Sequence, residues 1–221
     1  AIYELERALV ADHPDVNITP KLMSVLDEVN LNLLFSELSP NVVFHAAAYK
    51  HVPLFEENVR VGLNNNIFGT LNLVRVCELY SIEKFVLVST DKAVRPTNVM
   101  GASKRVCELI IQARAAEAEL DGTIFCMVRF GNVLGSSGSV VPLFQEQINR
   151  GGPVTVTSAE MTRFFMSISE ASELVLQASS LAKGGDVFVL DMGRPVKIIE
   201  LAKNMIARTS SQDEIEIRVT G

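Results

Sequence analysis

The sequence predicts an α/β protein built on a doubly wound, mostly parallel sheet. Three observations lead to this prediction. The chain has 221 residues and is 48% hydrophobic, which is ample for a buried core. Short apolar runs recur along it, and segments of helical periodicity separate them. Alternation of this kind is typical of parallel strands joined by right-handed helical crossovers.

Four apolar runs are expected to form the sheet. Each is short, rich in β-branched and aromatic residues and bounded by polar residues, as buried parallel strands are. The runs are residues 41–48, 84–90, 123–130 and 186–191. Residues 215–221 predict a further strand at the end of the chain.

Helices are predicted where apolar residues recur every three or four positions, as in segments 63–79 and 102–119. Ser169, followed by Glu170 and Glu173, predicts the capped start of a helix that runs toward Ala182. Segment 195–206 predicts one more helix.

The apolar stripes of the two long helices, which include Leu79 and Leu109, are expected to face the core. One of these stripes is alternatively a dimer face.

A sheet that binds dinucleotides usually begins with a strand and a G-x-G-x-x-G turn, whose backbone amides hold the pyrophosphate. No such glycine cluster lies near the start of this sequence, and residues 1–5 have the pattern of the helix after the second strand. We therefore expect a Rossmann-like sheet that lacks its first βα unit, in a chain truncated at both ends.

Charge and cysteine content restrict the function classes. The formal net charge is −6 and no basic run occurs, which argues against a nucleic-acid surface. The three cysteines lie in apolar patterns, which predicts reduced core thiols in a reducing compartment. No segment has the pattern of a leader peptide or the length of a membrane span, so we expect the piece shown to be soluble.

Residues that could move protons follow the second predicted strand. Ser89, Thr90, Asp91 and Lys92 place two hydroxyls, a carboxylate and an amine at the end of a strand, where ligands bind in open parallel sheets. An isolated cluster of this kind is about as often a turn cap beside a solvated lysine. Further on, Met100 and Lys104 are spaced by four residues, which puts both on one face of a helix.

These residues resemble those of the extended short-chain dehydrogenase/reductases, in which a Ser or Thr and a Tyr-x-x-x-Lys pair form the redox centre. The closer resemblance is to bacterial nucleoside-diphosphate-sugar 4,6-dehydratases, and within them to the capsule and O-antigen branch acting on UDP-N-acetylglucosamine. Members of that branch often carry Met in place of the tyrosine, as Met100 does here. The matching segments are 45–53, 65–70, 88–98, 100–104 and 129–133.

The resemblance implies an internal redox reaction that yields a UDP-4-keto-6-deoxy sugar. NAD or NADP accepts a hydride from sugar C4, water leaves across C5 and C6, and the hydride returns to C6. Because the Met100 thioether has no ionisable proton, the acid and base must lie elsewhere. By motif position Lys92 is the candidate base and Asp91 the candidate acid, although their roles could be reversed.

The resemblance also implies roles for the flanking residues. Ser89 or Thr90 hydrogen-bonds the C4 oxygen, and Lys104 holds the nicotinamide ribose. Further residues expected near the cofactor are Ser24, Val25, His45, Ala46, Ala47, Ala48 and Asn65. Residues expected near the substrate are Lys50, Asn98, Asn132, Ser139, Val140, Pro142 and Arg163, the last as a bidentate ligand of the diphosphate. No metal site is expected, because His45 and His51 lack companions at ligand spacing.

These assignments divide the chain into two parts. Residues 1–134, with about 168–192, are expected to form a Rossmann-like NAD-binding domain. Residues from about 135 to 167 and 193 to 221 are expected to form a small C-terminal α/β subdomain that binds substrate.

Three alternatives stay open at this stage. A nucleotide-sugar epimerase shares the fold, the cofactor and much of the motif set, although Asp91 and Lys92 favour dehydration. A non-catalytic sugar-nucleotide-binding or scaffold domain is the alternative from another class, and Met100 could mark an inactive site.

We expect a UDP-sugar as ligand, no nucleic acid, and a homo-oligomer, because relatives pair through their two long helices. The expected location is cytoplasmic, with membrane attachment only through an N-terminal region absent from this chain. The protein would then be the cytoplasmic domain of a bacterial inner-membrane protein.

Overall fold

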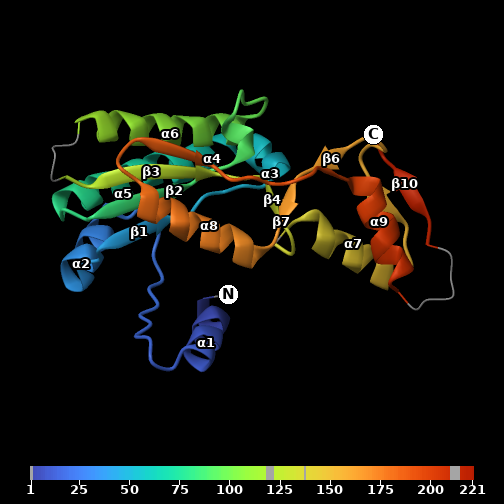
Figure 1. The fold of residues 1–221 in the computed structure, drawn as a ribbon, viewed down its shortest axis with the longest axis horizontal. Helices are drawn as coiled ribbons and strands as arrows, with labels where there is room; N and C mark the ends of the chain where they lie inside the picture. Colours follow the sequence, from blue (N-terminus) through green and yellow to red (C-terminus); the bar gives the residue numbers. More distant parts are fainter. Residues whose placement is uncertain (1, 118–121, 137, 210–214) are drawn as a thin grey trace.

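A parallel sheet forms the centre of the molecule, as the sequence predicts. The structure, a computed structural model, describes residues 2–117, 122–136, 138–209 and 215–221. The sheet has the order β1-β2-β3-β8, and every neighbouring pair is parallel (Figure 1). Its strands are β1 (Val42–His45), β2 (Lys84–Val88), β3 (Ile124–Arg129) and β8 (Asp186–Val189).

Side chains that alternate along β2 and β3 divide the core into two layers. Phe85, Leu87 and Phe125 point to the face covered by α2 (Glu28–Leu38), α5 (Gly69–Leu79) and α6 (Val99–Glu117). Val86 and Val128 point to the opposite face, which α8 (Ile168–Leu181) covers. Figure 1 shows α6 and α8 on opposite sides of the sheet. Because both faces are buried, these strands appear in the sequence as nearly continuous apolar runs.

The start of α8 differs from the prediction. The N-cap is Ser167, not Ser169, because the Ser167 hydroxyl accepts a hydrogen bond from the Glu170 amide at 3.1 Å. The Glu170 carboxylate accepts one from the Ser167 amide at 3.4 Å, which completes a capping box. Ser and Glu must be three residues apart for this exchange, and only Ser167 has that spacing.

The helix predicted over residues 63–79 begins earlier and contains an irregular turn. It runs through α4 (Val59–Leu63), the π-helical turn η1 (Asn64–Phe68) and α5. Helix α6 also begins earlier than predicted, because Asn98 Oδ1 accepts from the Gly101 amide at 2.8 Å and caps it. The predicted residues 118 and 119 lie outside the described residues.

The prediction that Leu79 and Leu109 face the core is wrong. Leu79 is 69% exposed and Leu109 is 49% exposed. The buried positions of these helices are neighbours on the sheet side, such as Cys77 and Ile111. A dimer face made from such a stripe stays a prediction.

The C-terminal part has an apolar cluster of its own. Helices α7 (Val140–Asn149) and α9 (Ile198–Ala207) pack around a parallel pair formed by β5 (Val154–Val156) and β10 (Ile217–Val219). Two short pairs connect this part to the rest of the chain. They are β4 (Asn132–Val133) with β7 (Phe165–Met166), and β6 (Thr162–Arg163) with β9 (Val196–Lys197).

The remaining elements are α1 (Ile2–Asp12), α3 (Val52–Glu57) and the 3₁₀ turn η2 (Asp91–Ala93). Helix α1 has no buried residue and lies apart from the sheet in Figure 1. The three cysteines are buried and free of disulfides, as expected. Among the described residues, no helix combines the length and the apolar character needed to cross a membrane.

Candidate active site

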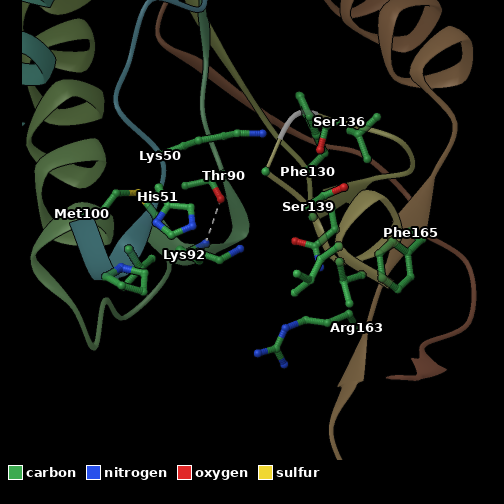
Figure 2. A pocket seen from close by; sticks show the side chains of 18 of the residues that line it. Lys50, His51, Thr90, Lys92, Met100, Phe130, Ser136, Ser139, Arg163 and Phe165 are labelled. Atoms are coloured by element: carbon green, nitrogen blue, oxygen red, sulfur yellow. Dashed lines mark hydrogen bonds between the residues drawn. The ribbon is translucent and has the colours of Figure 1, made fainter. Parts of the chain in front are cut away.

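A cavity of about 590 Å³ lies between the carboxyl ends of the sheet strands and the C-terminal part (Figure 2). Its wall comes from the segments after β1, β2 and β3, from α6, and from the strands of the C-terminal part. The predicted site residues that line it are Ala46, Ala48, Lys50, Ser89, Thr90, Lys92, Met100, Lys104, Asn132, Ser139, Val140 and Arg163. Residues from distant parts of the sequence therefore meet in one place.

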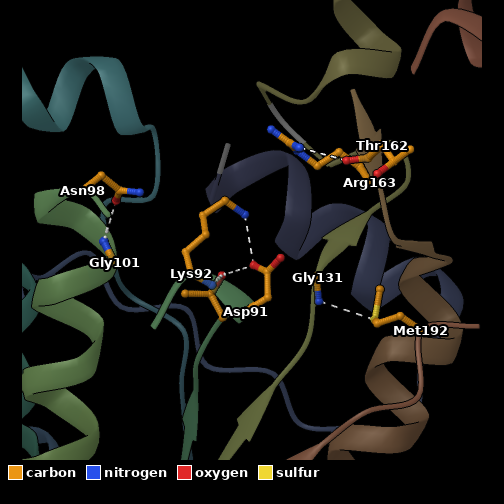
Figure 3. A network of polar contacts seen from close by, with 9 residues as sticks. Asp91, Lys92, Asn98, Gly101, Gly131, Thr162, Arg163 and Met192 are labelled. Carbon is orange, nitrogen blue, oxygen red and sulfur yellow. Dashed lines mark hydrogen bonds and ion pairs between the residues drawn. The ribbon is translucent and has the colours of Figure 1, made fainter. Parts of the chain in front are cut away.

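The turn after β2 holds its polar side chains in a local network (Figure 3). The Lys92 ammonium lies 3.1 Å from Asp91 Oδ1, and the Thr90 hydroxyl donates to the same oxygen at 2.9 Å. The Asp91 side chain is 47% exposed and the Lys92 side chain 33% exposed. Of this ion pair only Lys92 lines the cavity.

Gly101 lets this turn lie against the first turn of α6. A Cβ atom at position 101 would lie 2.3 Å from the Lys92 carbonyl oxygen, which is far inside van der Waals contact. The position of the Lys92 backbone therefore depends on a glycine at position 101, nine residues later in the chain.

Met100 and Lys104 both line the cavity from one face of α6. The Met100 side chain is buried, and the Lys104 ammonium donates to the Val88 carbonyl oxygen at 2.7 Å. Burial lowers the pKa of Lys104, and nearby Cys107 and Glu108 oppose that shift. A thioether thus stands beside a desolvated amine, one helical turn away.

His45 lies at the end of β1, beneath the cavity wall. Its Nε2 lies 2.9 Å from the Thr70 hydroxyl, which donates its own proton to the Asn66 carbonyl oxygen at 2.6 Å. His45 Nε2 must then be the donor. Burial, and secondarily the charge of Lys104, lower the pKa of His45 to about 3, so the ring is neutral.

The irregular turn η1 positions the segment after β1. The buried Asn66 side chain accepts from the Tyr49 amide at 2.8 Å and donates to the Tyr49 carbonyl at 3.0 Å. It also donates to the Ser103 hydroxyl of α6 at 3.1 Å. This clamp fixes Lys50 and His51 at the cavity rim. Single π-helical turns of this kind are frequent at functional sites.

Other predicted residues lie near the cavity without lining it. Asn65 donates to the Ala47 carbonyl at 3.3 Å and braces the loop, and Asn98 caps α6. Ser24 accepts from the Leu26 amide. The predicted site residues that do not line the cavity are Ser24, Val25, His45, Ala47, Asn65, Asp91, Asn98 and Pro142. Their roles toward ligands stay predictions.

The Ser139 hydroxyl oxygen is buried in the cavity wall without a hydrogen-bond partner among the described residues. A buried hydroxyl that lacks a partner is costly, so this atom is suited to a ligand. Arg163 lines the same cavity and is exposed, with its guanidinium donating to the Thr162 carbonyl at 2.8 Å.

The structure also shows cavity residues to which the sequence analysis assigned no ligand role. Tyr49, His51, Phe130, Ser136 and Phe165 line the cavity. Glu108 lies behind the cavity wall, where its carboxylate accepts a hydrogen bond from the Ser89 hydroxyl. The spacing of Glu108, four residues after Lys104, was a usable signal, since it places both on one face of α6.

The sequence profile described as "Polysaccharide biosynthesis protein" matches residues 1–221, the whole chain. The chain belongs to this family. Two curated relatives are similar to it over nearly the whole of this chain. "Capsular polysaccharide biosynthesis protein CapD" of Staphylococcus aureus is 50% identical over 97% of this chain and 36% of its own length. "Probable polysaccharide biosynthesis protein EpsC" of Bacillus subtilis is 51% identical over 91% of this chain and 33% of its own length.

This member of the polysaccharide biosynthesis protein family thus spans about a third of those two relatives. A protein named UDP-glucose 4-epimerase from Rickettsia bellii is 39% identical over 89% of this chain and 58% of its own. The solved structure of Pen from Bacillus thuringiensis superposes with a TM-score of 0.91, at 32% identity over 99% of this chain and 67% of that one. The Thermus thermophilus UDP-glucose 4-epimerase complex with NAD, at 19% identity and TM-score 0.78, shares the fold over 98% of this chain and 81% of that one.

Proposed function

We propose that this chain supplies the active site of a nucleotide-sugar 4,6-dehydratase that converts UDP-N-acetylglucosamine to a UDP-4-keto-6-deoxy sugar. The observation that carries the proposal is that buried Met100 and Lys104 line the same cavity as Lys92, which forms an ion pair with Asp91. The capsular polysaccharide name of the Staphylococcus aureus relative favours a role in making capsular polysaccharide.

The cavity wall suits NAD or NADP at one end. Ala46 and Ala48 have small side chains that allow close approach, and Lys104 offers an amine to a ribose hydroxyl. The cofactor would supply the hydride acceptor and donor of the reaction. The protein supplies orientation and proton transfer.

Proton transfer falls to the turn after β2. Met100 carries no proton to exchange, so the base for the C5 proton and the acid for the C6 hydroxyl come from Lys92 and Asp91. Only Lys92 lines the cavity, which favours Lys92 as the group that meets the sugar first. Asp91, whose Oδ1 lies 3.1 Å from the Lys92 ammonium, would then exchange protons with Lys92 from the solvent side.

The nucleotide would lie toward the C-terminal part. Ser139 and Val140 stand at the N-terminal end of α7, where backbone amides favour phosphate oxygens, and Arg163 adds a fork of donors. The unpartnered Ser139 hydroxyl would gain a hydrogen bond there.

A nucleotide-sugar epimerase is the second candidate, favoured by the name of the Rickettsia bellii relative. Simple C4 epimerisation needs no acid for the C6 hydroxyl. The pairing of Asp91 with Lys92 at the cavity therefore supports the dehydratase over the epimerase.

Incubation of the full-length protein with UDP-N-acetylglucosamine and mass spectrometry of the sugar nucleotide tests the proposal. We expect a product lighter by one water. A product of unchanged mass whose sugar is altered by NMR supports the epimerase instead. Absence of both product and nucleotide binding supports a non-catalytic domain.

A further inference from the structure

Glu108 is a fully buried carboxylate directly behind the cavity wall. Its side chain is 0% exposed, and each of its oxygens accepts two hydrogen bonds. Oε1 accepts from the Ser89 hydroxyl at 2.7 Å and from Arg129 Nε at 2.7 Å. Oε2 accepts from Arg129 Nη2 at 2.6 Å and from Arg105 Nη1 at 2.9 Å. The acid-base steps described above leave this group unused.

The direction of the Ser89 hydrogen bond follows from the chemistry of the partners. An ionised carboxylate only accepts, and guanidinium groups only donate. Burial alone would raise the pKa of Glu108, but the hydrogen bonds from Arg129, Ser89 and Arg105 outweigh it and hold that pKa below its ordinary value. Glu108 therefore has no proton to give, and Ser89 must donate.

Ser89 consequently presents only lone pairs to the cavity. Its single proton is held at Glu108, and its backbone amide is fixed on the Val128 carbonyl at 2.8 Å. The neighbouring Thr90 proton is likewise engaged, with Asp91. A hydroxyl in this state can bind a ligand group that donates a hydrogen, such as a sugar hydroxyl, but it meets a carbonyl oxygen with its own lone pairs.

We propose that Glu108 is a positioning residue that fixes Ser89 as a hydrogen-bond acceptor, so that the site binds the sugar hydroxyl to be oxidised and disfavours a carbonyl at that carbon. This inference rests on the proposed dehydratase function, and it takes Ser89, one of the two hydroxyls expected at the C4 oxygen, as the one that contacts the sugar. In the proposed reaction the C4 ketone persists from the first hydride transfer until release. The preference for the alcohol therefore weakens binding of the 4-keto intermediate and of the finished 4-keto product, and it assists product release.

Glu108→Gln is expected to reverse the hydroxyl. Oε2 accepts from two guanidinium donors, Arg129 Nη2 and Arg105 Nη1, whereas Oε1 accepts from one, Arg129 Nε, and from the rotatable Ser89 hydroxyl. The amide nitrogen of glutamine is therefore expected at the Oε1 position, where it gives up the hydrogen bond from Arg129 Nε and donates to Ser89. Ser89 would in turn donate into the cavity and favour a carbonyl.

The test uses the full-length protein with Lys92→Met, which blocks water loss, and titration calorimetry with two ligands. These are UDP-N-acetylglucosamine and its 4-keto-6-deoxy product. We expect the ratio of the product Kd to the substrate Kd to fall about tenfold with E108Q, the size of one gained or lost hydrogen bond. Glu117→Gln, an exposed ion-paired glutamate of the same helix, is the matched control and should leave the ratio unchanged.

Ser89→Ala covers the case in which E108Q does not fold. It should weaken the substrate about tenfold and leave the 4-keto ligand unchanged or tighter. A ratio unmoved by E108Q, or a 4-keto ligand that loses at least as much affinity as the substrate with S89A, would overturn the proposal.

A readout without sugar separates this inference from the proposed function. The infrared difference spectrum between wild type and E108Q should show a carboxylate band for Glu108 at neutral pH. A band from a protonated carboxyl would overturn the assigned direction of the hydrogen bond from Ser89 to Glu108. If neither ligand binds to wild type or to E117Q, the dehydratase proposal fails, and the infrared result alone decides the state of Glu108.

Discussion

The α carbon of Gly101 lies so close to the Lys92 carbonyl oxygen that an added Cβ atom would stand 2.3 Å from it. The side of α6 that carries Met100 and Lys104 is thereby coupled to the turn that carries Asp91 and Lys92. This contact fixes the geometry of the Asp91–Ala93 turn relative to the first turn of α6.

Gly101→Ala should displace the Asp91–Ala93 turn. We expect a loss of about 1–3 kcal/mol in the free energy of unfolding, as for overpacking, and a fall in turnover of at least tenfold because Lys92 moves. Ala116→Ser, which adds an atom at an exposed position of α6, should change neither. Urea unfolding and turnover of the full-length protein measure both, and full activity in G101A contradicts the coupling.

Lys92→Met should abolish water loss from UDP-N-acetylglucosamine while nucleotide cofactor remains bound, because the amine that lines the cavity is removed without adding bulk. Lys203→Met, at an exposed ion pair with Glu200, is the control and should retain full turnover. Mass spectrometry of the product and absorbance of the released cofactor give the two readouts. Undiminished turnover in K92M would remove Lys92 from the mechanism.

Asn66→Ala should release the segment that carries Lys50 and His51. The Tyr49 amide and carbonyl lose their partner, and we expect a loss of about 1–3 kcal/mol in stability. Hydrogen exchange at the Tyr49 amide should rise with it. Asn32→Ala removes an exposed amide that donates to the Glu28 carbonyl and should leave the Tyr49 exchange rate unaltered.

The free energy of unfolding should fall in mild acid because His45 is buried as a neutral ring. Its pKa is lowered from 6.5 to about 3, so between these values the unfolded chain binds a proton that the folded chain does not. The stability from neutral His45 is present above pH 6.5 and is lost as pH falls toward 3. We expect a loss of about 2 kcal/mol from pH 7 to pH 5.

His45→Gln tests that dependence. Urea midpoints at pH 7 and pH 5 should differ by about 2 kcal/mol less in H45Q than in wild type. His13→Gln, at an exposed loop position, should keep the wild-type dependence. Equal slopes in H45Q and wild type would contradict the buried neutral ring.

Ser139→Ala should separate binding from stability. The Ser139 hydroxyl has no partner among the described residues, so its removal should leave the stability unchanged or slightly higher. The affinity for UDP should fall about tenfold, the worth of one lost hydrogen bond. Ser172→Ala removes a hydroxyl bound to the Ile168 carbonyl and should leave UDP binding intact. Titration calorimetry with UDP alone, on wild type, S139A and S172A, measures these affinities.

The sequence by itself determined the class of fold and supplied the candidate residues for the chemistry. Apolar runs such as 84–90 predicted strands because buried parallel strands show their two faces in one continuous run. The polar groups of Ser89–Lys92 and the Met100–Lys104 spacing were readable because each depends on neighbours close in the chain. The start of α8 was misplaced by two residues because two serines offer similar capping chemistry there, and the three-residue spacing to Glu170 that a capping box needs is met by Ser167 and not by Ser169.

Only the tertiary structure decided which of these groups share a cavity and which way their protons point. Glu108 meets Ser89, 19 residues earlier, and Arg129, 21 residues later. Leu79 and Leu109 have the apolar character of core residues but face outward, since helix rotation is set by packing against the sheet. Contacts between distant segments depend on how whole helices and strands pack, and the local hydrophobic pattern of a segment does not predict that packing.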